Sequence, residues 1–204
     1  MLRTDPLHDS LTDPPALHAR AMDNLRFIRD TMERAGSFTA VPGWGGVAMG
    51  TTVLAAAPLA ALQPTPARWL AVWIAEAIVA VAIAAAAVLR KARSGGTPLL
   101  LAPARKFALS LSPPLVAGAL LTVALYRAGL ADRLPGVWLL LYGTGVVAGG
   151  AFSVRIVPVM GMCFMLVGAL GLFGPAAWGN WCMAIGFGAL HVVFGWFIAR
   201  KYGG

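Results

Sequence analysis

Charged residues and cysteines are scarce in this 204-residue chain. It has eight Asp and Glu residues and two cysteines, and charged residues of both signs make up only 12% of it. A typical soluble domain carries about 25% charged residues, so the composition excludes an ordinary soluble domain. The apolar fraction is 59% and the mean hydropathy is +0.76. These values predict one compact domain that lies largely in lipid.

The chain also lacks the motifs of the common enzyme classes. We find no nucleophile elbow, Walker loop, paired catalytic carboxylates or haem-binding histidine pair, so we expect no enzyme and no cofactor. Cys163 and Cys182 lie in different apolar segments, and their spacing fits neither a CxxC motif nor a metal site. We therefore expect free thiols and no bound metal. The polar first 42 residues also contain no signal-peptide core.

Six apolar segments are long enough to cross a bilayer as helices, which takes about 20 residues each. They predict an all-α fold, a polytopic membrane bundle over residues 43–204 in which short outer loops join the helices into three hairpins. Whether these hairpins are true sequence repeats stays open, because membrane hairpins place proline, tryptophan and arginine at similar depths. The predicted spans are residues 43–62, 68–89, 107–126, 134–152, 156–174 and 178–199.

Consecutive prolines interrupt the third predicted span. Pro113 and Pro114 each lack a backbone N–H, and proline disfavours helix in the residue before it. One interpretation is a kink about two turns into a helix that begins at Phe107. The other is a helix that begins at Pro113, after a short re-entrant segment. We favour the kink.

The basic residues are distributed unequally between the two sides that these spans define. Positive charge gathers on the cytoplasmic side of membrane proteins, so this distribution predicts that both termini are cytoplasmic. It also explains the net charge of +8 without nucleic-acid binding, which we do not expect. One side has Arg3, Arg20, Arg26, Arg29, Arg34, Arg90, Lys91, Arg93, Arg105, Lys106, Arg155, Arg200 and Lys201, and the other has Arg68, Arg127 and Arg133.

Tryptophans lie near the predicted outer ends of the even-numbered spans. Indole favours the membrane interface, because its ring is apolar and its N–H needs a polar partner. We expect these side chains to form an interfacial belt, and we expect interfacial hydrogen bonds for Tyr142 and Asn180. The tryptophans are Trp69, Trp73, Trp138, Trp178 and Trp181.

The segment before the first span divides into two parts. Residues 1–15 are rich in Asp, Pro and Ser and are predicted to be disordered. In residues 16–36, apolar side chains recur every three or four positions, which predicts an amphipathic helix. That helix either lies on the cytoplasmic leaflet or docks on a partner membrane protein. The apolar positions are Leu17, Ala21, Leu25, Ile28 and Met32.

Glu76 and His191 form the candidate polar site within the membrane. Glu76 is the one carboxylate inside any predicted span, and such residues usually face the bundle interior or water. Helical rise places His191 at a similar depth, so the two side chains are candidates for a pair. Proton or cation handling is the functional interpretation, and a protonated, hydrogen-bonded acid beside a packed histidine is the structural one.

Basic residues at the predicted inner ends of the spans are candidate contacts for anionic lipid headgroups. Arg155, in the tight turn before Pro158, could instead cap a backbone carbonyl. The other partners that the sequence leaves open are a second copy of the chain, in a homo-oligomer, and the bilayer itself. The headgroup candidates are Arg90, Lys91, Arg105, Lys106 and Arg155.

Three stretches carry a resemblance to known sequences. They are residues 25–46 (LRFIRDTMERAGSFTAVPGWGG), 105–114 (RKFALSLSPP) and 153–161 (SVRIVPVMG). The chain resembles a group of uncharacterised bacterial multi-span membrane proteins over nearly its whole length. The resemblance implies a protein of a bacterial inner membrane but no activity and no site residues.

Two functional hypotheses follow. The first is a non-catalytic accessory, structural or sensor-like component of a membrane complex that docks through residues 16–36. The alternative is a small-solute or ion carrier that uses Glu76 and His191. We favour the first, because a carrier needs a polar path and the spans contain few polar side chains.

Overall fold

The computed structural model describes residues 19–28, 42–94, 101–151 and 153–202. The chain divides into two units, residues 1–37 and 38–204. In the first unit, residues 19–28 form a helix, within the range predicted for the amphipathic segment. The remainder of that prediction, and the disorder predicted for residues 1–15, fall outside the described residues. All regular structure in the described ranges is helical, which confirms the all-α prediction.

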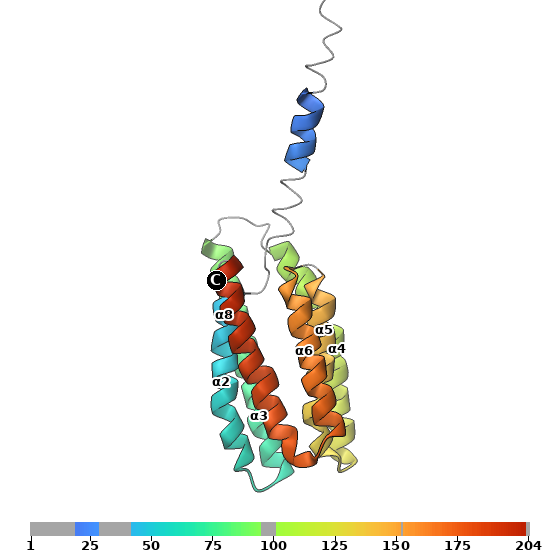
Figure 1. Cartoon of the computed structure of the whole chain (residues 1–204). Helices are drawn as coiled ribbons and strands as arrows, with labels where there is room; N and C mark the ends of the chain where they lie inside the picture. Colours follow the sequence, from blue (N-terminus) through green and yellow to red (C-terminus); the bar gives the residue numbers. More distant parts are fainter. Residues whose placement is uncertain (1–18, 29–41, 95–100, 152, 203–204) are drawn as a thin grey trace, which may run out of the picture. The chain divides into compact units, whose positions relative to one another are not determined.

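The second unit is a bundle of long helices with short connections (Figure 1). Its last helical stretch has three consecutive parts with a π-helical segment in the middle. In order, the elements are α2 (Gly43–Ala61), α3 (Pro66–Ser94), α4 (Leu101–Arg127), η2 (Ala131–Arg133), α5 (Leu134–Gly150), α6 (Ile156–Phe173), η3 (Ala176–Trp178), α7 (Gly179–Met183), the π-helical η4 (Ala184–Leu190) and α8 (His191–Tyr202).

Five helical segments of the described chain are long and apolar enough to cross a membrane. α5 is not among them, because it has 17 residues. It nevertheless packs between α4 and α6 and has no Asp, Glu, Lys or Arg. The five segments are Gly43–Ala61, Pro66–Arg90, Arg105–Arg127, Ile156–Phe173 and Ala176–Tyr202.

α4 runs without a break through Pro113 and Pro114. The interpretation that a new helix begins at Pro113 is therefore wrong. Pro113 has no N–H to bond the carbonyl of Leu109, four residues earlier. The Ser112 hydroxyl donates to that carbonyl instead, at 3.1 Å, so a side chain replaces one of the lost backbone bonds. α4 also begins at Leu101, six residues before the predicted start at Phe107.

The helices pack as two groups that lie side by side in Figure 1, α2 with α3 and α8, and α5 with α4 and α6. α5 makes its most extensive contacts with α6, and α8 makes its own with α2. The two helices of each expected hairpin are in contact. The contact is least extensive in the third hairpin, between α6 and the stretch formed by α7, η4 and α8. Contacts between helices of different hairpins, α5 with α6 and α2 with α8, therefore hold the bundle together as much as the hairpins do.

Glycines let the backbones of α2 and α8 approach closely. A Cβ on Gly43 would lie 2.3 Å from the backbone nitrogen of Ala199, and one on Gly50 would lie 2.5 Å from the carbonyl oxygen of Gly188. Gly195 fits in the same way against Gly43 and Val47. A Cβ on Gly46, four residues before Gly50, would lie 3.3 Å from the Cα of Gly195, so α2 uses a small-xxx-small pattern of the kind that packs membrane helix pairs.

We expect Gly50→Ala to destabilise the bundle by about 1–3 kcal/mol, because the added methyl group meets backbone atoms that cannot rotate away. Gly118→Ala is the matched control. Its Cβ would lie 3.6 Å from Leu141, an ordinary contact, and alanine is the better helix former by about 0.5–1 kcal/mol. Unfolding in mixed micelles measures both, and equal effects would contradict the proposed close packing.

Candidate functional site

His191 lies at the start of α8, directly after the π-helical segment. Its backbone N–H bonds to the carbonyl of Gly188 and not to that of Phe187, four residues earlier. The Phe187 carbonyl is thereby available to the imidazole, whose Nδ1 lies 2.8 Å from it. π-helical turns often occur at functional sites because they change where side chains and carbonyls point.

The second imidazole nitrogen is bonded to α5. Nε2 of His191 lies 2.8 Å from the hydroxyl of Tyr142. A carbonyl only accepts hydrogen bonds, so Nδ1 carries the proton and Nε2 of the neutral ring accepts from Tyr142. Tyr142 therefore bonds inside the bundle, and the prediction of an interfacial hydrogen bond for it is wrong.

Aromatic rings enclose this hydrogen bond. The ring of Tyr142 contacts Phe164 and Phe187 edge to face, with centroids 4.9 and 5.1 Å apart. Phe164 is fully buried and contacts His191 edge to face at 5.1 Å. His191 itself is 6% exposed. The cluster joins α5, α6 and α8 through a packed, hydrogen-bonded histidine.

Glu76 of α3 has a different partner. Its Oε1 lies 2.7 Å from the hydroxyl of Thr52 in α2, and both side chains are half-buried. Within the described residues, no hydrogen bond or ion pair joins Glu76 to His191. The two predicted site residues thus lie at different helix interfaces.

Three of the predicted belt tryptophans pack together in the bundle, one of them buried and the other two half-buried. The rings of Trp69 and Trp138 stack, with centroids 5.7 Å apart, and Trp73 contacts Trp69 edge to face at 6.3 Å. Trp73 is only 3% exposed, so the interfacial prediction is wrong for it. Trp178 and Trp181 are exposed, as a belt requires.

Hydrogen bonds fix this indole cluster to neighbouring helices. Trp69 donates to the side chain of Asn180 at 2.8 Å, and Trp138 donates to the Thr122 hydroxyl at 2.8 Å. That hydroxyl in turn donates to the carbonyl of Gly118 at 2.7 Å. The indole N–H of Trp73 is buried and has no hydrogen-bond acceptor among the residues that the structure describes. The cluster therefore links α3, α4, α5 and α7.

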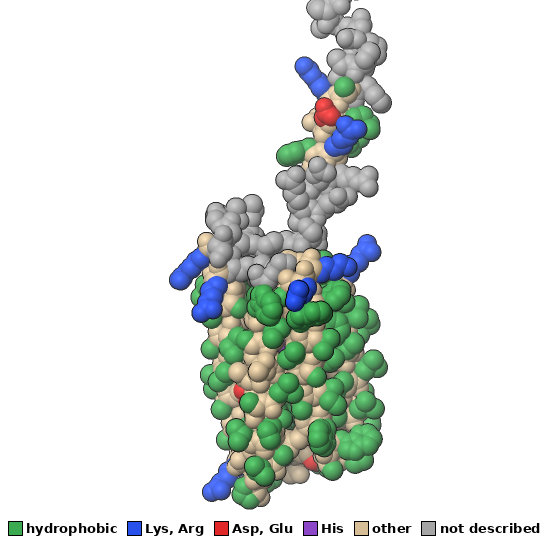
Figure 2. Space-filling view, turned by 60° about the vertical axis from the view of Figure 1, so that its left-hand side comes forward, with side chains coloured by type: hydrophobic (Ala, Val, Ile, Leu, Met, Phe, Trp, Pro, Cys, Tyr) green, Lys and Arg blue, Asp and Glu red, His purple; other side chains and the backbone are tan. Residues whose placement is uncertain are grey.

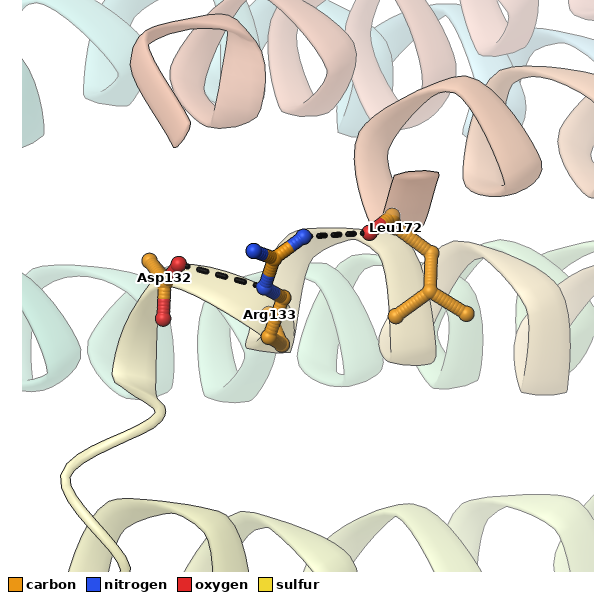
Figure 3. Close-up of polar contacts among 3 residues, drawn as sticks. All are labelled: Asp132, Arg133 and Leu172. Carbon is orange, nitrogen blue, oxygen red and sulfur yellow. Dashed lines mark hydrogen bonds and ion pairs between the residues drawn. The ribbon is translucent and has the colours of Figure 1, made fainter. Parts of the chain in front are cut away.

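Arg133 provides a contact that the charge pattern did not reveal. Figure 3 shows its guanidinium between Asp132 and the end of α6, where Nη1 donates to the carbonyl of Leu172 at 2.7 Å. The Nε atom lies 3.2 Å from an Asp132 carboxylate oxygen. The last carbonyls of a helix have no partner within it, so Arg133 caps α6 and ties it to the turn before α5.

The headgroup candidates lie at the ends of helices. Side chains of Arg90, Arg105, Lys106 and Arg155 are exposed, and the side chain of Lys91 is outside the described part of the structure. Figure 2 shows most Lys and Arg side chains of the bundle near one end, with a largely uncharged wall below them. This placement suits contact with headgroups at that end.

Comparisons with protein-family models, with curated proteins and with solved structures find no match to this chain. The arrangement of its own residues is therefore the basis for any functional proposal. Chemically, Glu76 and His191 act as hydrogen-bonded links between helices. A metal site would need a cluster of His, Cys, Asp or Glu, and the described residues contain no such cluster of three.

We expect Tyr142→Phe to destabilise the bundle by about 1–3 kcal/mol, because it leaves Nε2 of buried His191 without a donor. Tyr126→Phe is the control. Tyr126 is 38% exposed on α4, and its loss should change stability by less than about 0.5 kcal/mol. Unfolding in mixed micelles compares the two variants. A Tyr142→Phe protein as stable as Tyr126→Phe would exclude a stabilising tyrosine–histidine bond.

We expect Arg133→Gln to lower the free energy of unfolding by about 1–2 kcal/mol. This is the lower end for a charged hydrogen bond, because the guanidinium is partly exposed. Arg127→Gln removes an exposed cation near the same end of the bundle and should change stability by less than about 0.5 kcal/mol. Asp132→Asn removes the ion pair with Arg133 and leaves the hydrogen bond from Arg133 to the Leu172 carbonyl in place. If Asp132→Asn matched Arg133→Gln, the ion pair and not the cap would be the stabilising contact.

Proposed function

We propose that this chain is an integral protein of a bacterial inner membrane, with six spans in three hairpins and both termini in the cytoplasm. The inclusion of α5 rests on its 17 apolar residues, the lower end of the length of about 17–25 residues that suits a span. The gathering of basic side chains at one end of the bundle supports the orientation. The resemblance to bacterial multi-span proteins remains a prediction.

Within that membrane, the proposed role is that of a non-catalytic accessory, structural or sensor-like component of a complex. The observation that carries this proposal is the way the intramembrane polar groups are used. His191 bonds to Tyr142 and to the Phe187 carbonyl, while Glu76 bonds to Thr52. Each is occupied by a neighbouring helix, which is what a packed scaffold requires.

The helix at residues 19–28 is the proposed docking element. On its predicted apolar face, Leu25 and Ile28 are 60% and 52% exposed. On the opposite side of the helix, Arg26 pairs with Asp23 at 3.6 Å. An amphipathic helix with an exposed apolar face gains free energy by burying that face on a partner protein or in a bilayer surface. We propose a partner membrane protein as the occupant.

The alternative is a small-solute or ion carrier that uses Glu76 and His191. What favours it is the presence of ionisable side chains inside two apolar spans, which is costly and often functional. The separate hydrogen-bond partners of the two residues count against a shared binding site. We therefore retain the accessory role as the main proposal.

We expect Leu25→Glu to abolish the stoichiometric association of the purified protein with a partner from its native membrane, because it places a charge in the apolar docking face. Ala19→Glu is the matched control. It adds the same charge to an exposed position on the side of the helix that carries Asp23 and Arg26, and should retain the partner. Affinity purification followed by quantitative mass spectrometry measures both.

Solute flux in proteoliposomes tests the alternative. Flux that survives removal of residues 1–36 and is lost in Glu76→Gln would overturn the accessory role in favour of the carrier. A partner retained by both Leu25→Glu and Ala19→Glu would instead show that docking does not use this helix.

A further inference from the structure

Thr52 lies within hydrogen-bond distance of two oxygen atoms. Its hydroxyl oxygen is 2.8 Å from the backbone carbonyl of Met49 in its own helix and 2.7 Å from Oε1 of Glu76 in α3. A threonine hydroxyl has one proton and can donate only one hydrogen bond. A carbonyl oxygen accepts and never donates. The third oxygen, on Glu76, therefore decides how the two short contacts are made.

If Glu76 were a carboxylate, one short contact would have no proton. The hydroxyl proton would bond either Met49 or Glu76, and the remaining pair of oxygens would face each other as two acceptors. A carboxylate there would also need a counter-charge, because an unpaired ion in an apolar medium is very unfavourable. α2 has no ionisable side chain, and the nearest basic residues of α3, Arg68 and Arg90, are about 12 and 21 Å away along the helix.

A protonated Glu76 satisfies both contacts. Its Oε1–H donates to the Thr52 hydroxyl, which donates in turn to the Met49 carbonyl. Thr122 has the same arrangement elsewhere in the bundle. Its hydroxyl bonds its own helix at Gly118 and receives a hydrogen bond from the Trp138 indole, which can only donate. The parallel assigns the donor role to Glu76.

We propose that Glu76 is a proton-binding site inside the membrane, and that the bound proton joins α3 to α2 through Thr52. α3 depends on such contacts because it lies at the periphery of the bundle. In its most apolar stretch 6% of the residues are buried, against 39% in that of α2. α3 also donates a cross-helix hydrogen bond from Trp69 to Asn180, near its start. Loss of the proton removes the donor and leaves a charge at the α2–α3 interface. This proposal does not depend on the docking role.

The test uses infrared spectroscopy of the full chain in lipid nanodiscs at neutral pH. The chain has eight Asp and Glu residues, and Glu76 is the one within the long helices of the bundle. We expect the carbonyl band of a protonated carboxylic acid, at about one group per chain. The band should vanish in Glu76→Gln and remain in Asp132→Asn, whose carboxylate pairs with Arg133.

Thr52 variants test the hydrogen bond without changing the acid. Thr52→Val removes the acceptor, so the acid band should shift to the higher frequency of a weakly bonded carboxyl group. Thr52→Ser keeps the hydroxyl and should leave the band in place. Absence of the band at neutral pH, or a band that does not move in Thr52→Val, would overturn the proposal. The Thr52 pair keeps the test valid if Glu76→Gln fails to fold.

Discussion

Direct contact between helix backbones at glycine is the interaction on which this bundle depends. In lipid the hydrophobic effect does not drive helices together, because lipid tails are as apolar as leucine. Association then relies on close packing and on hydrogen bonds between helices. The α2–α8 pair has the first through Gly43, Gly50 and Gly195, and α5 approaches α6 through Gly136, where a Cβ would lie 2.4 Å from the backbone nitrogen of Leu172. These contacts set the distances at which the polar links can form.

The polar links follow from that packing. With α5, α6 and α8 held close, the Tyr142 hydroxyl reaches His191. With α5 against α6, Arg133 reaches the last turn of α6. Each link satisfies a polar group that would otherwise lack a partner in an apolar environment, where that loss is expensive. Glycine packing and hydrogen bonding are therefore parts of one arrangement, and each limits how far the other can change.

The sequence was sufficient to predict the helices but not their polar contacts. Apolar length and charge position located the long helices to within about six residues at either end, because both signals are local, and five of the segments found are long and apolar enough to cross a membrane. The partner of His191 depends on the π-helical segment, which rotates the last helix by a fraction of a turn and has no clear sequence signal. Trp73 was misplaced for a similar reason: indole depth is predictable from the span, but the face that it occupies is set by tertiary packing.

Arg133 shows how a structural role can obscure a topological signal. It is one of three basic residues predicted on the outer side, and so counts against the orientation in a simple tally. Its guanidinium is bound to Asp132 and to the Leu172 carbonyl, and those contacts give a reason for a cation at that position that is unrelated to orientation. The two other basic residues on that side, Arg68 and Arg127, are exposed. The charge asymmetry relevant to orientation is therefore stronger than the residue count, because one of its exceptions is a helix cap.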